Sequence, residues 1–167
     1  SFDSPSALAH WQGGPAELDA HGSGQCLRMS NADPDGSTML RLALPTASLV
    51  GRFITLRASV KAENVSEPPN RWNGVKAMLA IATPEGAAHP QADIPLGSFD
   101  WIRVEKALRI PKSARQIDLA LGLERSTGTV WFDDLEIRLG RPGAGMRLDE
   151  PFKGHGLSRL RGVMHGP

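Results

Sequence analysis

The sequence predicts an all-β protein, either a sandwich or a barrel. Several stretches alternate apolar and polar residues with a period of two, which is typical of half-buried strands. Gly, Pro, Asn and Asp separate these stretches at short intervals, as in the turn from Asn31 to Gly36. No window shows an apolar stripe of helical period and helical length. About eight or nine short strands at this spacing indicate two packed or closed antiparallel sheets.

The expected strands follow from this alternation, taken in chain order. Gly-Ser-Gly joins the first two, and Pro45 and Pro111 each end a strand. In the clearest strand, Ile54 and Val60 belong to an apolar face, and Thr55 belongs to a polar one. Long polar loops are expected at residues 63–73 and 83–99. The expected strands cover residues 17–21, 26–29, 39–44, 53–60, 75–81, 101–110, 117–123 and 130–139.

Composition excludes several classes of function. With 167 residues, 40% hydrophobic and 22% charged, the chain is that of an ordinary globular domain. A net charge of +1 gives no general electrostatic reason to bind nucleic acid or an anionic membrane. The single cysteine, Cys26, permits no internal disulfide and is expected to be buried. No nucleophile elbow, zinc-protease motif, phosphate loop or dinucleotide fingerprint is found.

The chain divides at its last expected strand. Residues 1–139 carry the strand pattern and form one β-sandwich module. Residues 140–167 begin as a linker, rich in Gly and Pro, and end on an apolar strand-like run. We expect this tail to be the start of a following catalytic domain.

Two adjacent carboxylates, Asp133 and Asp134, interrupt the last expected strand. Neighbouring strand residues point to opposite faces, so the pair is not expected to form the acid and base of a glycosidase. Unpaired buried charge is costly, and a cation would neutralise it. Calcium accepts carboxylate and carbonyl oxygens, and Asp3 at the other end of the chain could complete such a site. The alternative is that both aspartates are solvated at a strand end or bulge.

Small side chains are expected on the outer faces of two strands. Met78, Ala80 and Ala82 share one face, and Asp118, Ala120 and Gly122 share another. They leave a flat or concave floor, on which either a loop or a ligand could lie.

The order of short motifs along residues 1–139 resembles a known group of proteins. Besides Phe2-Asp3, the motifs are Gly24-Gln25-Cys26-Leu27, Gly51-Arg52-Phe53-Ile54 with Ser59-Val60-Lys61-Ala62, Phe99-Asp100-Trp101 with Ile110-Pro111, and Phe132-Asp133-Asp134-Leu135. Together they resemble the galactose-binding-like carbohydrate-binding modules of families four, nine and twenty-two. The resemblance implies a jelly-roll β-sandwich of two antiparallel sheets. It also implies a structural calcium at Asp3, Asp133 and Asp134, and glycan on the concave sheet or edge loops.

Sugar recognition needs a flat apolar surface and a few fixed polar groups. Trp72, in a polar loop, is either an exposed platform for the sugar or a packed side chain. Trp131 is expected to face the groove or a covering loop, and Trp101 to belong to the core. Glu124, at the end of its strand, is the leading polar contact, partly from the resemblance. Weaker candidates are Gln91 and Arg103.

We therefore expect a non-catalytic module that targets a secreted bacterial glycoside hydrolase to plant polysaccharide, namely β-glucan, cellulose or xylan. Arg161-Gly162-Val163 resembles the lead-in to the catalytic barrel of family five glycoside hydrolases. The alternative is an accessory domain that binds no glycan and stabilises the adjoining catalytic domain. A jelly-roll enzyme is a third, less favoured reading. Exposure of Trp72 and Trp131 on one concave face would favour the binding module, and burial of every tryptophan the accessory domain.

Overall fold

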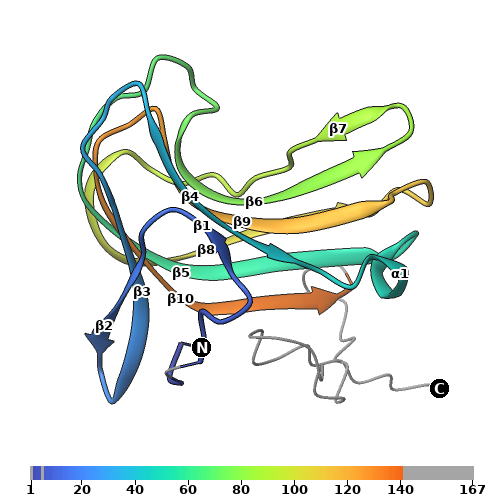
Figure 1. Cartoon of the computed structure of the whole chain (residues 1–167), viewed down its shortest axis with the longest axis horizontal. Helices are drawn as coiled ribbons and strands as arrows, with labels where there is room; N and C mark the ends of the chain where they lie inside the picture. Colours follow the sequence, from blue (N-terminus) through green and yellow to red (C-terminus); the bar gives the residue numbers. More distant parts are fainter. Residues whose placement is uncertain (1, 5, 141–167) are drawn as a thin grey trace.

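The computed structural model describes residues 2–4 and 6–140, which fold as a jelly-roll β-sandwich of two antiparallel five-stranded sheets (Figure 1). Sheet I has the order β1 (Gln12–Gly13), β4 (Ser37–Ala43), β9 (Gln116–Glu124), β6 (Gly74–Thr83) and β7 (Gly86–Ala88). Sheet II has the order β2 (Glu17–His21), β3 (Gly24–Asn31), β10 (Gly128–Leu139), β5 (Phe53–Val65) and β8 (Gly97–Arg109). A short helix, α1 (Thr46–Leu49), follows β4. The predicted fold class is confirmed.

The core lies between the two sheets and is built from the alternation seen in the sequence. Ile54 and Val60 on β5 are fully buried, as are Leu119 on β9 and Phe132 on β10. Burying each such side chain contributes about 1.5–3 kcal/mol. Cys26 is also buried, as expected, and this desolvation, together with the nearby charges of two aspartates, raises the pKa of its thiol to about 11.

The long polar loops are shorter than expected. β5 continues through Val65, β7 lies inside the second loop, and β8 already begins at Gly97. Register shifts between Val60 and Ala62, and between Ala62 and Val65, allow β5 and β8 to stay paired through this polar stretch. Backbone pairing therefore extends beyond the residues whose side chains alternate. Residues 141–167, where a linker and a following domain are predicted, lie outside the described residues.

A β-bulge corrects the expected directions of Asp133 and Asp134. The register of β10 against β5 shifts between Asp133 and Glu136, and Asp134 has a φ of 47°. Phe132 and Leu135 on either side are both buried, so both carboxylates lie on the outer side of sheet II. The expectation of opposite faces is wrong because the bulge inserts one extra residue into the strand.

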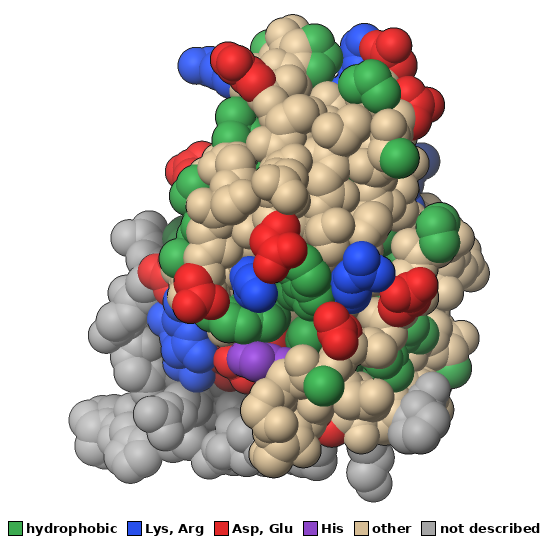
Figure 2. Space-filling model, turned by 90° about the vertical axis from the view of Figure 1, so that its left-hand side faces the viewer, with side chains coloured by type: hydrophobic (Ala, Val, Ile, Leu, Met, Phe, Trp, Pro, Cys, Tyr) green, Lys and Arg blue, Asp and Glu red, His purple; other side chains and the backbone are tan. Residues whose placement is uncertain are grey.

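Acidic and basic side chains are interspersed on the face of the molecule shown in Figure 2. This arrangement agrees with the near-neutral net charge of +1. In the described part of the chain, no helix is long and apolar enough to cross a membrane.

Candidate functional site

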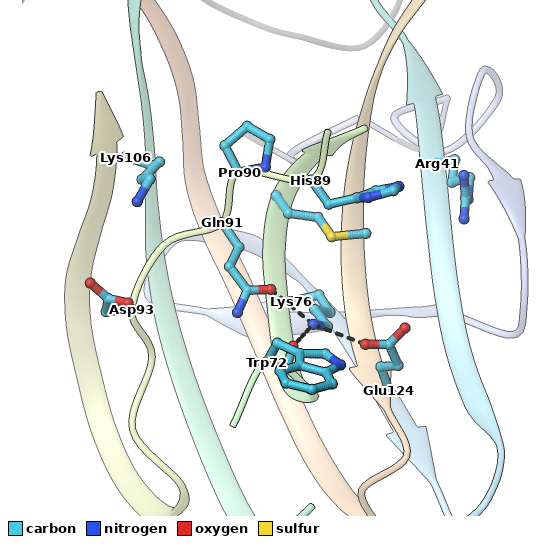
Figure 3. Close-up of a pocket in the computed structure, with 10 residues that line it drawn as sticks. Arg41, Trp72, Lys76, His89, Pro90, Gln91, Asp93, Lys106 and Glu124 are labelled. Carbon is cyan, nitrogen blue, oxygen red and sulfur yellow. Dashed lines mark hydrogen bonds and ion pairs between the residues drawn. The ribbon is translucent and has the colours of Figure 1, made fainter. Parts of the chain in front are cut away.

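The outer face of sheet I carries a groove of about 580 Å³. This volume is within the range of ligand sites in proteins, about 300–1,000 Å³. Most of its lining comes from β4, β6 and β9, from the loop before β6, and from the segment after β7 (Figure 3). The lining residues are Arg41, Trp72, Lys76, Met78, His89, Pro90, Gln91, Asp93, Lys106 and Glu124.

Small residues of β9 keep the floor of the groove low. Lys76 pairs with Gly122 across the sheet, and Met78 pairs with Ala120. Gly122 has a φ of 146°, and a Cβ there would lie only 2.0 Å from the Thr38 carbonyl oxygen, so this position requires glycine. The floor predicted from small side chains is therefore present, and it is part of the groove.

The segment after β7 forms one wall of the groove. Leu79 N donates to Pro90 O at 2.9 Å, and Ala92 N donates to Ala77 O at 3.0 Å. These bonds continue the pairing along β6 beyond β7. Gln91 lies opposite Met78 in this pairing and lines the groove with it.

The ammonium group of Lys76 is buried beneath the groove. This residue is only 3% exposed, and its Nζ donates to the carbonyl oxygen of Trp72 (Figure 3). It also donates to Gln91 Oε1 at 2.8 Å and to Glu124 Oε2 at 2.9 Å. An ammonium has three N–H donors, so all three are satisfied by three separate segments of the chain.

Glu124 is held in its ionised form. Burial acts to raise its pKa, but hydrogen bonds from Lys76 and Asn73 outweigh it and hold the pKa below the usual 4.5. Asn73 Nδ2 donates to the same Oε2 atom at 2.8 Å. Glu124 therefore presents a fixed carboxylate to the groove at neutral pH.

Trp72 is the most exposed large apolar side chain of the described residues, with 59% of its surface accessible. Its indole lies at the groove beside Lys76 and Glu124 (Figure 3). The contact between its carbonyl oxygen and Lys76 ties this loop to β6. The sequence leaves open whether the Trp72 side chain is exposed, and the structure shows that it is.

The structure divides the six sugar-site candidates between two faces. Trp72, Gln91 and Glu124 line the groove of sheet I, whereas Trp101, Trp131 and Arg103 belong to β8 and β10 of sheet II. A single concave face with both Trp72 and Trp131 is therefore not observed.

Trp131 does not line the groove, which excludes one of the two surroundings expected for it. Lys61 Nζ lies 4.9 Å from its ring centroid and Arg28 Cζ lies 5.9 Å from it. Its Nε1 donates to Asp19 Oδ2 at 2.9 Å. Cations on the neighbouring strands β3 and β5 therefore engage this indole through cation–π contacts, and Asp19 on β2 accepts its hydrogen bond.

Trp101 was expected in the core but is only half-buried. Its ring stacks on His21, with 4.2 Å between ring centroids. His21 Nδ1 lies 2.7 Å from Asp133 Oδ2, so one of the two adjacent aspartates is paired with this histidine. The prediction failed because the position of a strand's first apolar residue does not reveal which side of the sheet it faces.

The three predicted calcium ligands have protein hydrogen-bond partners. Asp3 Oδ1 accepts from Gln25 N at 2.9 Å, and Asp134 Oδ2 accepts from Ser59 Oγ at 2.9 Å. No group of three or more His, Cys, Asp or Glu side chains gathers as a metal site within residues 2–4 and 6–140. A calcium ion would therefore need backbone carbonyl oxygens as further ligands, and such ligands are common for calcium. The ion would compete with His21 for Asp133.

Sequence reasoning missed Lys76. It lies on the face of β6 opposite the strand's core-facing side chains, where a lysine is usually solvated. Its burial depends on the approach of Trp72 and Gln91, which belong to two other segments. A lysine flanked by Met78, Ala80 and Ala82 on its own strand face was the available signal.

No protein-family model matches the sequence, and no curated protein is significantly similar to it. Solved structures match its fold. One is the C-terminal family 22 carbohydrate-binding module of Clostridium thermocellum Xyn10B, at 15% identity, TM-score 0.54, and coverage of 78% of this chain and 86% of that one. Another is the CBM22-1 xylan-binding domain from Paenibacillus barcinonensis Xyn10C, at 15% identity, TM-score 0.58, and coverage of 83% and 90%.

A third match shows that the same fold also occurs within a protein of a different kind. The enzymatically active domain of bacteriophage CBA120 tailspike protein 4 has a TM-score of 0.59 at 12% identity, and the match covers 84% of this chain but 21% of that one. The protein therefore has the jelly-roll fold of carbohydrate-binding modules, a fold that also occurs within a larger active protein. A shared fold does not define a function, which depends on the residues of the groove.

The lowered pKa of Glu124 predicts a pH dependence of stability. A depressed carboxyl pKa stabilises the fold above the usual value of 4.5, and this contribution is lost as the pH falls through the lower folded-state pKa. We expect wild type to be more stable than Glu124→Gln near neutral pH, with the difference shrinking below pH 4.5. Urea unfolding of both proteins across this range measures it. A difference that stays constant with pH would contradict the ionised pair.

Proposed function

We propose that this domain is a non-catalytic carbohydrate-binding module whose glycan lies in the groove of sheet I. The observation that carries the proposal is the exposed indole of Trp72 beside fixed polar side chains in a groove of about 580 Å³. An indole offers a flat apolar face to the C–H groups of a pyranose ring. Gln91 and Glu124 offer hydrogen-bonding groups for its hydroxyls.

The proposed ligand is a plant polysaccharide of the β-glucan, cellulose or xylan type. Xylan is the first choice because the Paenibacillus barcinonensis domain with this fold is described as xylan-binding. We further propose that the module belongs to a secreted bacterial glycoside hydrolase. Attachment would raise the local concentration of the catalytic domain on its polymer, without the module taking part in the chemistry.

The accessory-domain alternative is supported by one observation. Of the four tryptophans, Trp11 is buried, Trp101 stacks on His21, and Trp131 is engaged by Lys61 and Arg28. Three of the four tryptophans are thus engaged within the domain, as expected of an accessory domain, whereas the exposed indole of Trp72 favours the binding module.

Affinity electrophoresis through gels with xylan, β-glucan, mannan or no polymer tests the proposal. We expect wild type to be retarded by xylan or β-glucan. Trp72→Ala should weaken binding by about tenfold or more, because it removes the stacking surface. Trp131→Ala is the matched control on sheet II and should be retarded as wild type. Absence of retardation for wild type in every gel would reject the binding module and favour the accessory domain.

We also propose that calcium is bound for stability by Asp133, with Asp3, Asp134 and nearby carbonyl oxygens as further candidate ligands. The proposal is supported by the hard oxygen donors and by the family resemblance. A bound ion would connect the beginning of the chain to β10. It would stabilise the protein because it binds the folded state alone.

Thermal unfolding with added calcium or with a chelator tests the ion. We expect calcium to raise the Tm of wild type and the chelator to lower it. Asp133→Ala should have a lower Tm that responds to neither addition. If wild type and Asp133→Ala both unfold at temperatures independent of calcium, the His21–Asp133 pair acts without a metal and the proposal is wrong.

A further inference from the structure

The environment of Lys76 defines which hydrogen bonds the groove can offer. We propose that Lys76 is a positioning residue that fixes Gln91 as a donor and Glu124 as an acceptor toward the ligand. The inference rests on the proposed function and deepens it, because it specifies the glycan surface that fits. It selects a glycan whose hydroxyl groups at these two positions are unsubstituted.

The ammonium of Lys76 can only donate hydrogen bonds, so each of its partners must turn an acceptor atom toward it. Its ammonium is buried, so each N–H needs an acceptor to offset the lost hydration. The acceptors are the carbonyl oxygen of Trp72, Gln91 Oε1 and Glu124 Oε2. They fill the capacity of the ammonium, so none of the three can turn away without leaving an unpaired N–H.

This arrangement determines the orientation of the Gln91 amide. Because an ammonium cannot accept, the oxygen of the amide must face Lys76 and the NH₂ group must point elsewhere. Gln91 pairs with Met78 on β6, and its side chain lines the groove. Its Nε2 donates to no atom of residues 2–4 and 6–140. Gln91 thus offers two N–H donors to a ligand.

Glu124 has the complementary role. Its Oε2 accepts from both Lys76 Nζ at 2.9 Å and Asn73 Nδ2 at 2.8 Å. Its Oε1 accepts from no group in the described part of the chain. The lowered pKa keeps this oxygen an acceptor at neutral pH. Glu124 thus offers a charged acceptor, which makes stronger hydrogen bonds than a neutral one.

The two offered groups lie on either side of Lys76 Nζ, because Gln91 Oε1 and Glu124 Oε2 both contact this nitrogen atom and the other atom of each group points outward (Figure 3). Two hydroxyls of one bound glycan match them: one oxygen accepts from Gln91 Nε2, and the other O–H donates to Glu124 Oε1. The Trp72 indole, held by the same lysine, contacts the ring face. Acetylation or methylation of the hydroxyl at Glu124 would remove its only donor and leave a carboxylate oxygen desolvated without a partner.

Calorimetric titration with xylohexaose and cellohexaose tests the inference on three variants of the protein. Gln91→Glu keeps an acceptor for Lys76 but replaces the amide donors with a second carboxylate. We expect it to fold with a Tm close to that of wild type and to bind at least about tenfold more weakly. Lys76→Met removes the positioning group and should weaken binding similarly. Lys61→Met, which removes a cation from the opposite sheet, should bind as wild type.

Acetylated and deacetylated xylan give a readout that a purely structural role of Lys76 would not change. Wild type should prefer the deacetylated polymer, Gln91→Glu should bind it more weakly, and Lys76→Met should lose the preference because Glu124 is no longer fixed. If wild type binds glycan and both Gln91→Glu and Lys76→Met bind as tightly, the inference is overturned while the proposed function stands. If wild type binds none of these glycans, the proposed function itself fails. Should Lys76→Met not fold, Gln91→Glu alone decides.

Discussion

The buried ammonium group of Lys76 is the interaction on which the arrangement of the groove depends. It is on β6, near one edge of sheet I, and its three acceptors come from the loop before β6, from the segment after β7 and from β9. A charge removed from water needs all of its hydrogen bonds, because each missing partner costs about 1–3 kcal/mol or more. One lysine therefore couples the positions of an aromatic surface, an amide and a carboxylate that are distant in the sequence.

The jelly-roll sandwich supplies the frame for this interaction. Small residues at Ala120 and Gly122 leave space above β9, and the pairing of residues 90–92 along β6 brings Gln91 beside Met78. The opposite sheet is also rich in aromatic and charged side chains, but they contact one another: Trp131 with Lys61, and Trp101 with His21. The difference between the faces lies in what remains open to a ligand, which is why the groove, and not the shared fold, supports a glycan-binding role.

Much of the framework could be predicted from the sequence because period-two alternation is a local property. The apolar face of Ile54 to Val60 and the burial of Phe132 follow from it directly, whereas the burial of Cys26 is expected from its residue type. Trp72, Gln91 and Glu124 were also named as candidates, since each is a suitable residue type at a loop or strand end. Their meeting in one groove depends on strand order, which alternation does not contain.

The failures have equally specific causes. The bulge at Asp134 requires a positive φ, for which the sequence carries no signal. This bulge places on the outer face of the sheet a carboxylate that was expected on the inner face. For Trp131 the sequence leaves both the groove and a covering loop open, because strand parity defines a side of its own sheet but not which sheet the strand joins. Lys76 was missed because its burial is produced by two distant segments that supply its acceptors.

The most direct test of this account is a nuclear magnetic resonance titration with xylohexaose that follows the four indole N–H signals, assigned by mutation. Each indole reports one location: Trp72 the groove, Trp131 and Trp101 the opposite sheet, and Trp11 the core. The account predicts that the Trp72 signal shifts with added sugar and that the Trp131 signal stays in place. A shift of Trp131 with Trp72 unchanged would place the ligand on sheet II and contradict the groove.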